Sequence, residues 1–219
     1  MCGRFTLRTP ASVLVRQFAV DAGLQLPLRY NIAPTQQVPV VRAVDGARQL
    51  AMTKWGLIPS WADDPKIGYS LINARSETAA TKPSFRAAIK SRRCLIPADG
   101  FFEWKKDGKK KLPIYFRRQD DQPFAFAGLW ERWSKGAEPV ESCTILTTSA
   151  NELVRPFHDR MPVILSPNDY NAWLDPQTTD ATNLTYLFVP FPIEELTAYP
   201  VNSVVNNARH EGADCIEAV

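Results

Sequence analysis

Short apolar runs separated by turn residues dominate the chain, and most of these runs are too short for helices. Residues 38–44 and 47–58 are two such runs, and they flank the dipeptide Asp45-Gly46. Asp-Gly between two β-like runs is typical of a type I′ hairpin turn. The pattern therefore predicts an antiparallel strand pair around residue 45.

The same pattern recurs further along the chain. Residues 94–118 contain two apolar runs around Asp107-Gly108, which predicts a second strand pair. Residues 122–133 and 142–150 are nearly continuous apolar runs of strand length and indicate buried strands.

Three segments have helical spacing instead. Residues 10–22 begin at a proline and carry apolar side chains at helical intervals, and residues 168–174 follow a proline-initiated turn. Residues 76–93 predict a helix that is broken or restarted at Pro83. Strands thus outnumber short helices, and no linker or repeat divides the sequence. We expect an α+β fold, with one β-rich domain over residues 1–219 and mostly antiparallel pairing.

Composition narrows the class of protein. With 219 residues, 45% of them hydrophobic, the chain can bury a large core and differs from disordered sequences. The net charge of +3 is too small to indicate a nucleic-acid binder by itself. No apolar run is long enough for a membrane span or a signal peptide, and the four cysteines lack zinc spacing. We therefore expect a cytoplasmic protein with reduced thiols.

The position of Cys2 raises a chemical question. If Met1 is removed, Cys2 carries an α-amine and a thiol on adjacent carbons, a combination that no internal cysteine has. The alternative is that Cys2 is a small residue at a frayed terminus.

Polar residues next to apolar runs are the other candidates for chemistry. Asn73 and Arg75 follow Leu71-Ile72, and they either belong to a site or form a capped turn before a helix. Glu103 lies in the aromatic run FFEW, where desolvation raises a carboxyl pKa, although strand alternation could equally direct it to water.

His158 is the better candidate proton carrier of the two histidines in the chain. It precedes Asp159, Arg160 and an apolar strand. The alternative is a solvated loop histidine.

Six ordered stretches carry a family resemblance. These are CGRF at the start, YNIAPTQ (30–36), WGLIPSW (55–61), INARSET (72–78), IPADGFFEWKK (96–106) and HDRMPVIL (158–165). Together they resemble the SRAP family, the SOS response-associated peptidases. The resemblance implies a curved, barrel-like mixed sheet and a covalent sensor of abasic sites in single-stranded DNA, active in the DNA damage response.

The resemblance also implies roles for individual residues. It casts Cys2 as the nucleophile, Asn73 and Glu103 as its partners, and His158 as the proton-transfer residue. The DNA-binding set that it implies consists of Arg4, Arg75, Pro34, Trp61, Asn31 and Arg160, with the two arginines Arg4 and Arg75 on phosphates and Pro34 and Trp61 as a wedge beside the lesion. No metal or cofactor is expected, and the expected partner is abasic single-stranded DNA, including junctions with duplex, bound by a monomer.

The chemistry explains why an N-terminal cysteine suits this task. At pH 7 roughly a tenth of an α-amine is neutral, against about one lysine in a few thousand, so the terminal nitrogen attacks an aldehyde far more readily. The resulting imine is prone to β-elimination. The Cys2 sulfur can close a five-membered thiazolidine on the same carbon, because the ring closure is intramolecular.

Basic and aromatic side chains supply an expected DNA surface. We expect phosphate contacts from Arg92-Arg93 and from Lys105 to Lys111, although the lysines could also form a solvated turn. Stacking surfaces are expected from four aromatic residues, namely Trp55, Trp61, Phe101 and Trp104.

Two other functions fit the same residues. In an N-terminal-nucleophile peptidase the Cys2 thiol would attack a peptide carbonyl, with autoproteolytic removal of Met1 as one consequence. In a non-catalytic reader of modified bases, Cys2 would be incidental. If the protein is instead a covalent sensor of abasic sites, lyase-type activity at the abasic site is a further expectation.

Overall fold

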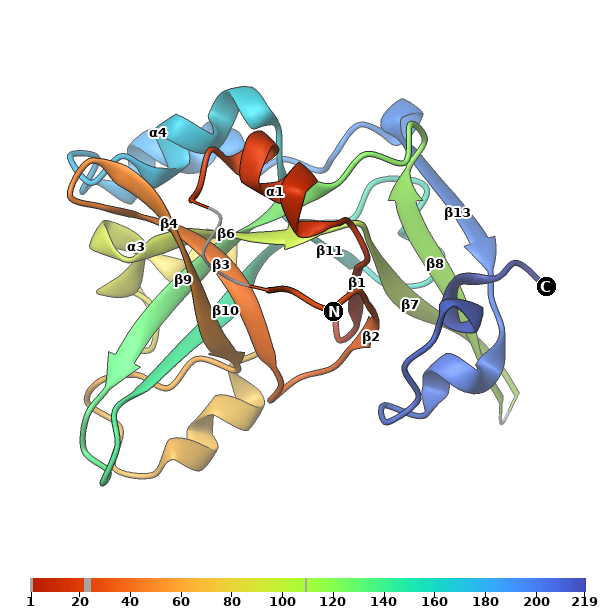
Figure 1. Cartoon of the computed structure of the whole chain (residues 1–219), viewed down its shortest axis with the longest axis horizontal. Coiled ribbons are helices and arrows are strands. Elements are labelled where there is room, and N and C mark those ends of the chain that lie inside the picture. The colour runs from red at the N-terminus through yellow and green to blue at the C-terminus, as the bar shows by residue number, and fades with distance from the viewer. Residues whose placement is uncertain (1, 22–24, 109) are drawn as a thin grey trace.

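The computed structural model describes residues 2–21, 25–108 and 110–219. Figure 1 shows two curved sheets that meet near the start of the chain, with short helices outside them. The fold is the expected α+β class with mostly antiparallel pairing. No helix among the described residues has the length and apolar character needed to cross a membrane.

The larger sheet follows the order β11-β10-β4-β3-β6-β9-β12, with β5 beside β10. Its strands are β3 (Gln37–Val44), β4 (Ala47–Trp55), β5 (Asn73–Arg75), β6 (Arg93–Ala98), β9 (Phe124–Trp133), β10 (Val140–Ser149), β11 (Arg160–Pro162) and β12 (Ile164–Leu165). Because β10 also pairs with β9, five of the strands close into a ring, as the barrel-like expectation required.

The smaller sheet has the order β13-β8-β7-β1-β2. Its strands are β1 (Phe5–Leu7), β2 (Arg29–Ile32), β7 (Gly100–Asp107), β8 (Lys110–Arg118) and β13 (Leu196–Pro200). A single residue, Asp99, separates β6 from β7, so the chain passes directly from one sheet into the other. The start of β1 consequently lies where the sheets meet (Figure 1).

Both predicted hairpins are confirmed. Asp45 and Gly46 have φ of 50° and 78°, the left-handed pair that a type I′ turn requires. Asp107-Gly108 likewise falls at the turn between β7 and β8. The predicted start of the second hairpin, at residue 94, was wrong. Residues 93–98 form β6, which belongs to the larger sheet and does not pair with β7.

The α-helices of the described residues are short, and they occur in the three predicted segments. The α-helices are α1 (Ala11–Phe18), α2 (Ser76–Ala79), α3 (Ala88–Ser91) and α4 (Tyr170–Leu174). The 3-10 helices are η1 (Pro65–Ser70), η2 (Pro167–Asp169), η3 (Ala181–Leu187), η4 (Ile193–Glu195), η5 (Ser203–Asn206) and η6 (Ala213–Ile216). The end of the predicted 10–22 helix lies partly outside the described residues.

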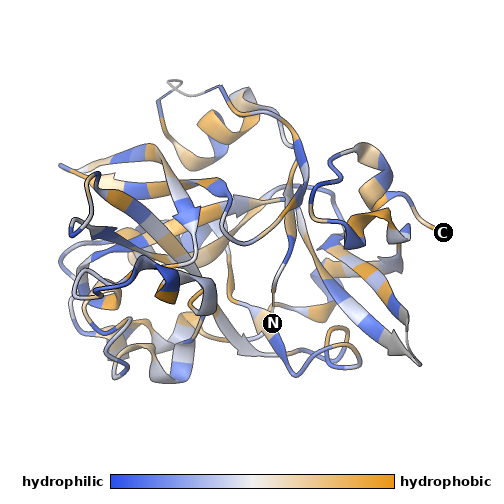
Figure 2. Ribbon diagram, turned by 90° about the horizontal axis from the view of Figure 1, so that it is seen from below, coloured by the Kyte–Doolittle hydropathy of each residue, from blue (hydrophilic) through white to orange (hydrophobic). Residues whose placement is uncertain are grey.

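Apolar side chains fill the space inside the ring and between the sheets. Hydrophobic and hydrophilic residues alternate along several strands in Figure 2, as expected where one face is buried. A separate small cluster around Phe102, Tyr115, Val205 and Cys215 attaches the C-terminal segment to the smaller sheet. This cluster places the C-terminal turns close to the first residues of the chain.

Candidate active site and nucleic-acid interface

Pairing between β1 and β7 brings the start of the chain to Glu103. Phe5 pairs with Phe101, and the Phe102 amide donates to the Arg4 carbonyl at 3.0 Å. Continued by two residues, this antiparallel register sets Glu103 opposite Gly3, next to Cys2. Side chains alternate along a strand, so Glu103 shares the inward face of β7 with the fully buried Phe101.

The Glu103 carboxyl is therefore desolvated. The residue is only 5% exposed, and this burial raises its pKa from 4.5 to about 7, with the negative charge of Asp159 acting in the same direction. A carboxyl that titrates near neutral pH can both donate and accept a proton there. The pKa expectation from the aromatic run is confirmed, and the water-facing alternative for Glu103 is wrong.

Cys2 is held inside the protein and is not frayed. Its side chain is fully buried, and its thiol lies 3.9 Å from the Arg4 carbonyl. The amide Nδ2 of Asn73 donates to the Cys2 carbonyl at 2.9 Å. Asn73 is fixed in turn because β5 runs parallel to β10, with Asn73 opposite Ile145. The Asn73 side chain thus fixes the backbone of the residue that would become the N-terminus.

Burial also shifts the pKa of the Cys2 thiol. Desolvation, and after it the charge of Glu103, raises the pKa of the thiol far above its ordinary value. The sulfur is consequently protonated at neutral pH. In the structure this thiol donates to the Arg4 carbonyl.

His158 lies at the end of the loop between β10 and β11. Its Nδ1 accepts a hydrogen bond from the Arg160 amide at 2.9 Å, and a carboxylate oxygen of Asp159 lies 2.9 Å from the same nitrogen. Burial lowers the pKa of His158. The negative charge of Asp159 opposes this lowering of the His158 pKa and contributes to the raised pKa of Glu103.

Arg4 is the first of the predicted DNA-binding residues, and its guanidinium is braced. Nη1 donates to Asn31 Oδ1 at 2.5 Å and to the Val205 carbonyl at 2.7 Å, and the guanidinium lies 5.7 Å from the centre of the Trp104 ring. Arg4 keeps part of its surface exposed.

Asn31 does not reach the surface. It is fully buried, and its Nδ2 donates to the carbonyls of Asn207 at 3.0 Å and His210 at 2.7 Å. Direct contact of Asn31 with DNA is therefore excluded by its burial. Its amide instead ties the C-terminal segment to the Arg4 guanidinium.

Arg160 is also occupied within the protein. Its guanidinium forms two bonds to the Glu77 carboxylate, at 2.6 and 2.8 Å, and is 9% exposed. Glu77 and Asp159, which the sequence did not single out, each contact a residue of the predicted site, Arg160 and His158 respectively. The signal for Glu77 was its place in the motif INARSET, two residues after Arg75.

The exposed members of the predicted set lie on loops and short strands. Arg75 is exposed, Pro34 is half-buried, and Trp61 is 51% exposed with its indole nitrogen 3.3 Å from the Pro83 carbonyl. Thr35, next to Pro34, has φ of 75°. Positive φ in a β-branched residue is a strained conformation, and such strain is concentrated at functional sites.

Several predicted DNA contacts were wrong. Trp55 and Phe101 are fully buried in the core and offer no stacking surface. Arg93 is only 5% exposed. Its guanidinium caps the C-terminal ends of α3 and α4 by donating to the carbonyls of Ile89, Lys90, Trp173 and Asp175. Arg92 pairs with Glu131 at 2.8 Å but keeps 27% of its side chain exposed, so its phosphate contact stays a prediction, as do those of the lysines. Lys105 and Lys111 are exposed, while the prediction for Lys109 lies outside the described residues.

One group of potential metal donors is present in the described part of the chain, in the C-terminal segment. The donor atoms of His210, Asp214 and Cys215 lie within 4.8 Å of one another. His210 Nε2 is 2.8 Å from both oxygens of Asp214, so these two side chains already satisfy each other. None of these three residues belongs to the predicted site.

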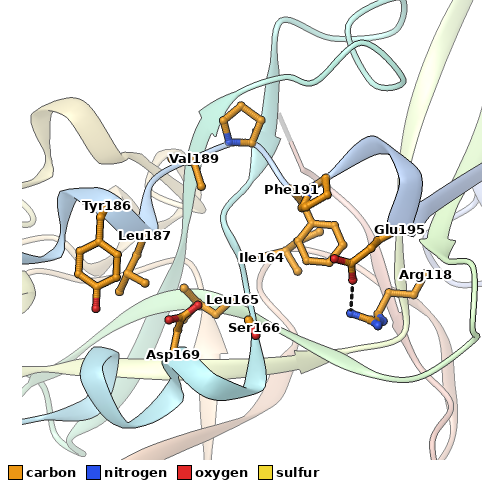
Figure 3. A pocket seen from close by; sticks show the side chains of 12 residues that line it. Arg118, Ile164, Leu165, Ser166, Asp169, Tyr186, Leu187, Val189, Phe191 and Glu195 are labelled. Atoms are coloured by element: carbon orange, nitrogen blue, oxygen red, sulfur yellow. Dashed lines mark ion pairs between the residues drawn. The ribbon is translucent and has the colours of Figure 1, made fainter.

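A pocket of about 240 Å³ lies between β12 and the segment before β13, as Figure 3 shows. Its lining is mostly apolar, with an ion pair of 3.1 Å between Arg118 and Glu195 at one side. None of its lining residues belongs to the predicted site.

Comparisons with known proteins agree with the motif order. The family model described as SOS response associated peptidase (SRAP) matches residues 1–208. The chain is 43% identical to the abasic site processing protein YoqW of Bacillus subtilis over the full length of both chains. It is 32% identical to the abasic site processing protein YedK of Escherichia coli, again over both full lengths. A crystal structure of a Bacteroides thetaiotaomicron protein superposes with a TM-score of 0.88 at 25% identity and covers all of both chains.

Proposed function

The chain belongs to the SRAP family, and on that premise we propose that it processes abasic sites by forming a thiazolidine crosslink between Cys2 and single-stranded DNA. Relatives across its full length bear the name abasic site processing protein. The observation that carries the proposal is the position of Asn73 and Glu103 beside the first residues of the chain. Asn73 donates to the Cys2 carbonyl at 2.9 Å, and Glu103 supplies a carboxyl with a pKa of about 7.

The reaction begins once Met1 has been removed. The neutral α-amine of Cys2 adds to the open-chain aldehyde of the abasic sugar, and loss of water gives an imine. Glu103 in its ionised form accepts the proton that the amine must lose, and in its neutral form it donates the proton that leaves with the hydroxyl. A pKa near 7 populates both forms at neutral pH.

Ring closure follows on the same carbon. The Cys2 sulfur bonds to the imine carbon, and the thiol proton ends on the nitrogen. One C–N and one C–S bond have then formed, and one water has been released. Since burial keeps the thiol protonated, Glu103 is also suited to relay this proton.

The protonated thiol favours this order of events over a peptidase. A thiol-first peptidase needs the thiolate, which burial and the neighbouring Glu103 disfavour. An amine-first mechanism uses the sulfur only in the second step, when its target is adjacent. His158 is proposed to move a proton at the sugar oxygen when the sugar ring opens and when the adduct reverses.

Single-stranded DNA would lie across the exposed residues of the site. Arg75 is proposed to contact a phosphate together with Arg4, whose head group Asn31 and the Val205 carbonyl orient. Trp61 and Pro34 are proposed to separate the bases next to the lesion. Phosphate contacts make this binding salt-dependent and insensitive to sequence.

The test is a denaturing gel of protein incubated with single-stranded DNA that carries one abasic site. We expect a heat-stable crosslink with the native chain, none with Cys2→Ala, and a less stable adduct with Cys2→Ser. Cys143→Ala, which removes another buried thiol, is the matched control and should crosslink normally.

Two results would contradict the proposal. Crosslinking of Cys2→Ala to the native extent would show that another nucleophile reacts. Reversible binding without any adduct, or turnover of peptides that depends on Cys2, would favour one of the two other functions.

A further inference from the structure

An ion pair behind the proposed site connects two separate segments of the chain. Glu77 lies in α2, and Arg160 is the first residue of β11. The pair is bidentate, with N–O distances of 2.6 and 2.8 Å, and the Arg160 side chain is largely buried. A bidentate arginine–carboxylate pair fixes the orientation of both planar groups.

The pair crosses over one strand of the larger sheet. Thr147 in β10 pairs with Arg75 of β5 on one side and with Pro162 of β11 on the other. Arg160 Nη2 also donates to the Thr147 carbonyl at 2.5 Å. The side chain of Arg160 is thus anchored both to β10, the strand beside its own, and to α2.

This anchoring reaches His158 through the backbone. The Arg160 amide donates to His158 Nδ1 at 2.9 Å. A ring nitrogen that accepts this bond carries no proton, so the neutral imidazole keeps its proton on Nε2. A carboxylate oxygen of Asp159 also lies 2.9 Å from Nδ1 and would accept a hydrogen bond from this nitrogen if Nδ1 were protonated. The position of the Arg160 amide therefore decides which partner Nδ1 has.

We propose that Glu77 is a positioning residue that acts through Arg160 on His158. By fixing the Arg160 side chain, Glu77 keeps the amide on His158 Nδ1 and leaves Nε2 as the nitrogen available for proton transfer. This inference rests on the proposed function, since it assigns a device that orients the proposed proton carrier.

The experiment compares crosslinking rates of Glu77→Gln and the native chain over a range of abasic DNA concentrations. We expect the rate at saturating DNA to fall about tenfold, a part of the 10²- to 10⁴-fold that general acid–base catalysis supplies. The DNA concentration at half-saturation should stay within about twofold, because the exposed binding residues are unchanged.

A double-mutant cycle separates positioning from general destabilisation. In a His158→Ala background, Glu77→Gln should cause no further loss of rate, because the group on which it acts is gone. Glu152→Gln is the matched control, since it breaks the 2.6 Å ion pair to Arg155 in the same loop without touching Arg160. It should crosslink at the native rate.

The outcomes are distinguishable. A native rate in Glu77→Gln, or an equal loss of rate in the His158→Ala background, would overturn the inference. A change only in the DNA concentration at half-saturation would also overturn the inference, because Glu77 would then act on DNA binding. Absence of a crosslink in the native chain would instead refute the proposed function.

Discussion

Replacing Glu103 by glutamine tests whether one buried carboxyl serves the reaction at a cost in stability. The side chain is 5% exposed, and its pKa is raised from 4.5 to about 7 by burial. At about 1.4 kcal/mol per pH unit, ionisation of this carboxyl in the folded protein costs about 3 kcal/mol more than in the unfolded chain.

The sign of the pH dependence follows from this difference. Below pH 4.5 the carboxyl is neutral in both states, and Glu103 carries no ionisation penalty. Between pH 4.5 and 7 the unfolded chain loses the proton while the folded protein retains it, so stability declines as the pH rises. Above pH 7 both states are ionised and the full penalty of about 3 kcal/mol applies.

Glutamine has nearly the same shape and does not ionise. Glu103→Gln should therefore be more stable than the native chain by up to about 3 kcal/mol at pH 8, with most of the gain absent at pH 4.5. For a chain of this length the gain corresponds to a rise in Tm of about 6–12 °C. Crosslinking at pH 7 should nevertheless slow by about 10²-fold or more, with DNA affinity retained.

The assay is urea unfolding of both proteins at pH 4.5 and pH 8, alongside crosslinking rates and DNA titrations at pH 7. A stability difference that is the same at both pH values would refute the argument from the raised pKa. An equal loss of DNA affinity and rate would show that Glu103 has a structural role.

Three further substitutions test the assignment of the surrounding residues. Arg93→Ala should lower the free energy of unfolding by about 2–4 kcal/mol, because it leaves buried helix-terminal carbonyls unpaired, yet the folded fraction should bind DNA normally in a filter-binding assay. Trp61→Ala should weaken binding of single-stranded DNA by about 1–3 kcal/mol with an unchanged Tm, and an unaltered affinity would remove Trp61 from the interface. Asn31→Ala should destabilise the protein by about 1–3 kcal/mol and also weaken DNA binding, since the Arg4 guanidinium loses a buried partner; a loss of stability with native salt dependence of binding would limit Asn31 to the fold.

Local residue patterns were sufficient to predict the hairpins and the short helices of this protein. Asp45-Gly46 specified its hairpin because few residue pairs adopt left-handed backbone at both positions. The aromatic run around Glu103 suggested a desolvated carboxyl but left a water-facing one open, and the pairing of β7 with β1 decided between the two. The order of six motifs likewise predicted the family.

Local patterns did not show which charged and aromatic side chains a ligand can reach, because long-range packing sets their exposure. Arg93 and Arg75 are both arginines beside apolar strands, but one is buried at two helix ends and the other is exposed. In the same way, Trp55 is buried in the core and Trp61 is exposed. The reason is physical: burial depends on strands and turns far away in the chain, and no local pattern records them. The pairing of Glu77 with Arg160, 83 positions apart, has the same origin.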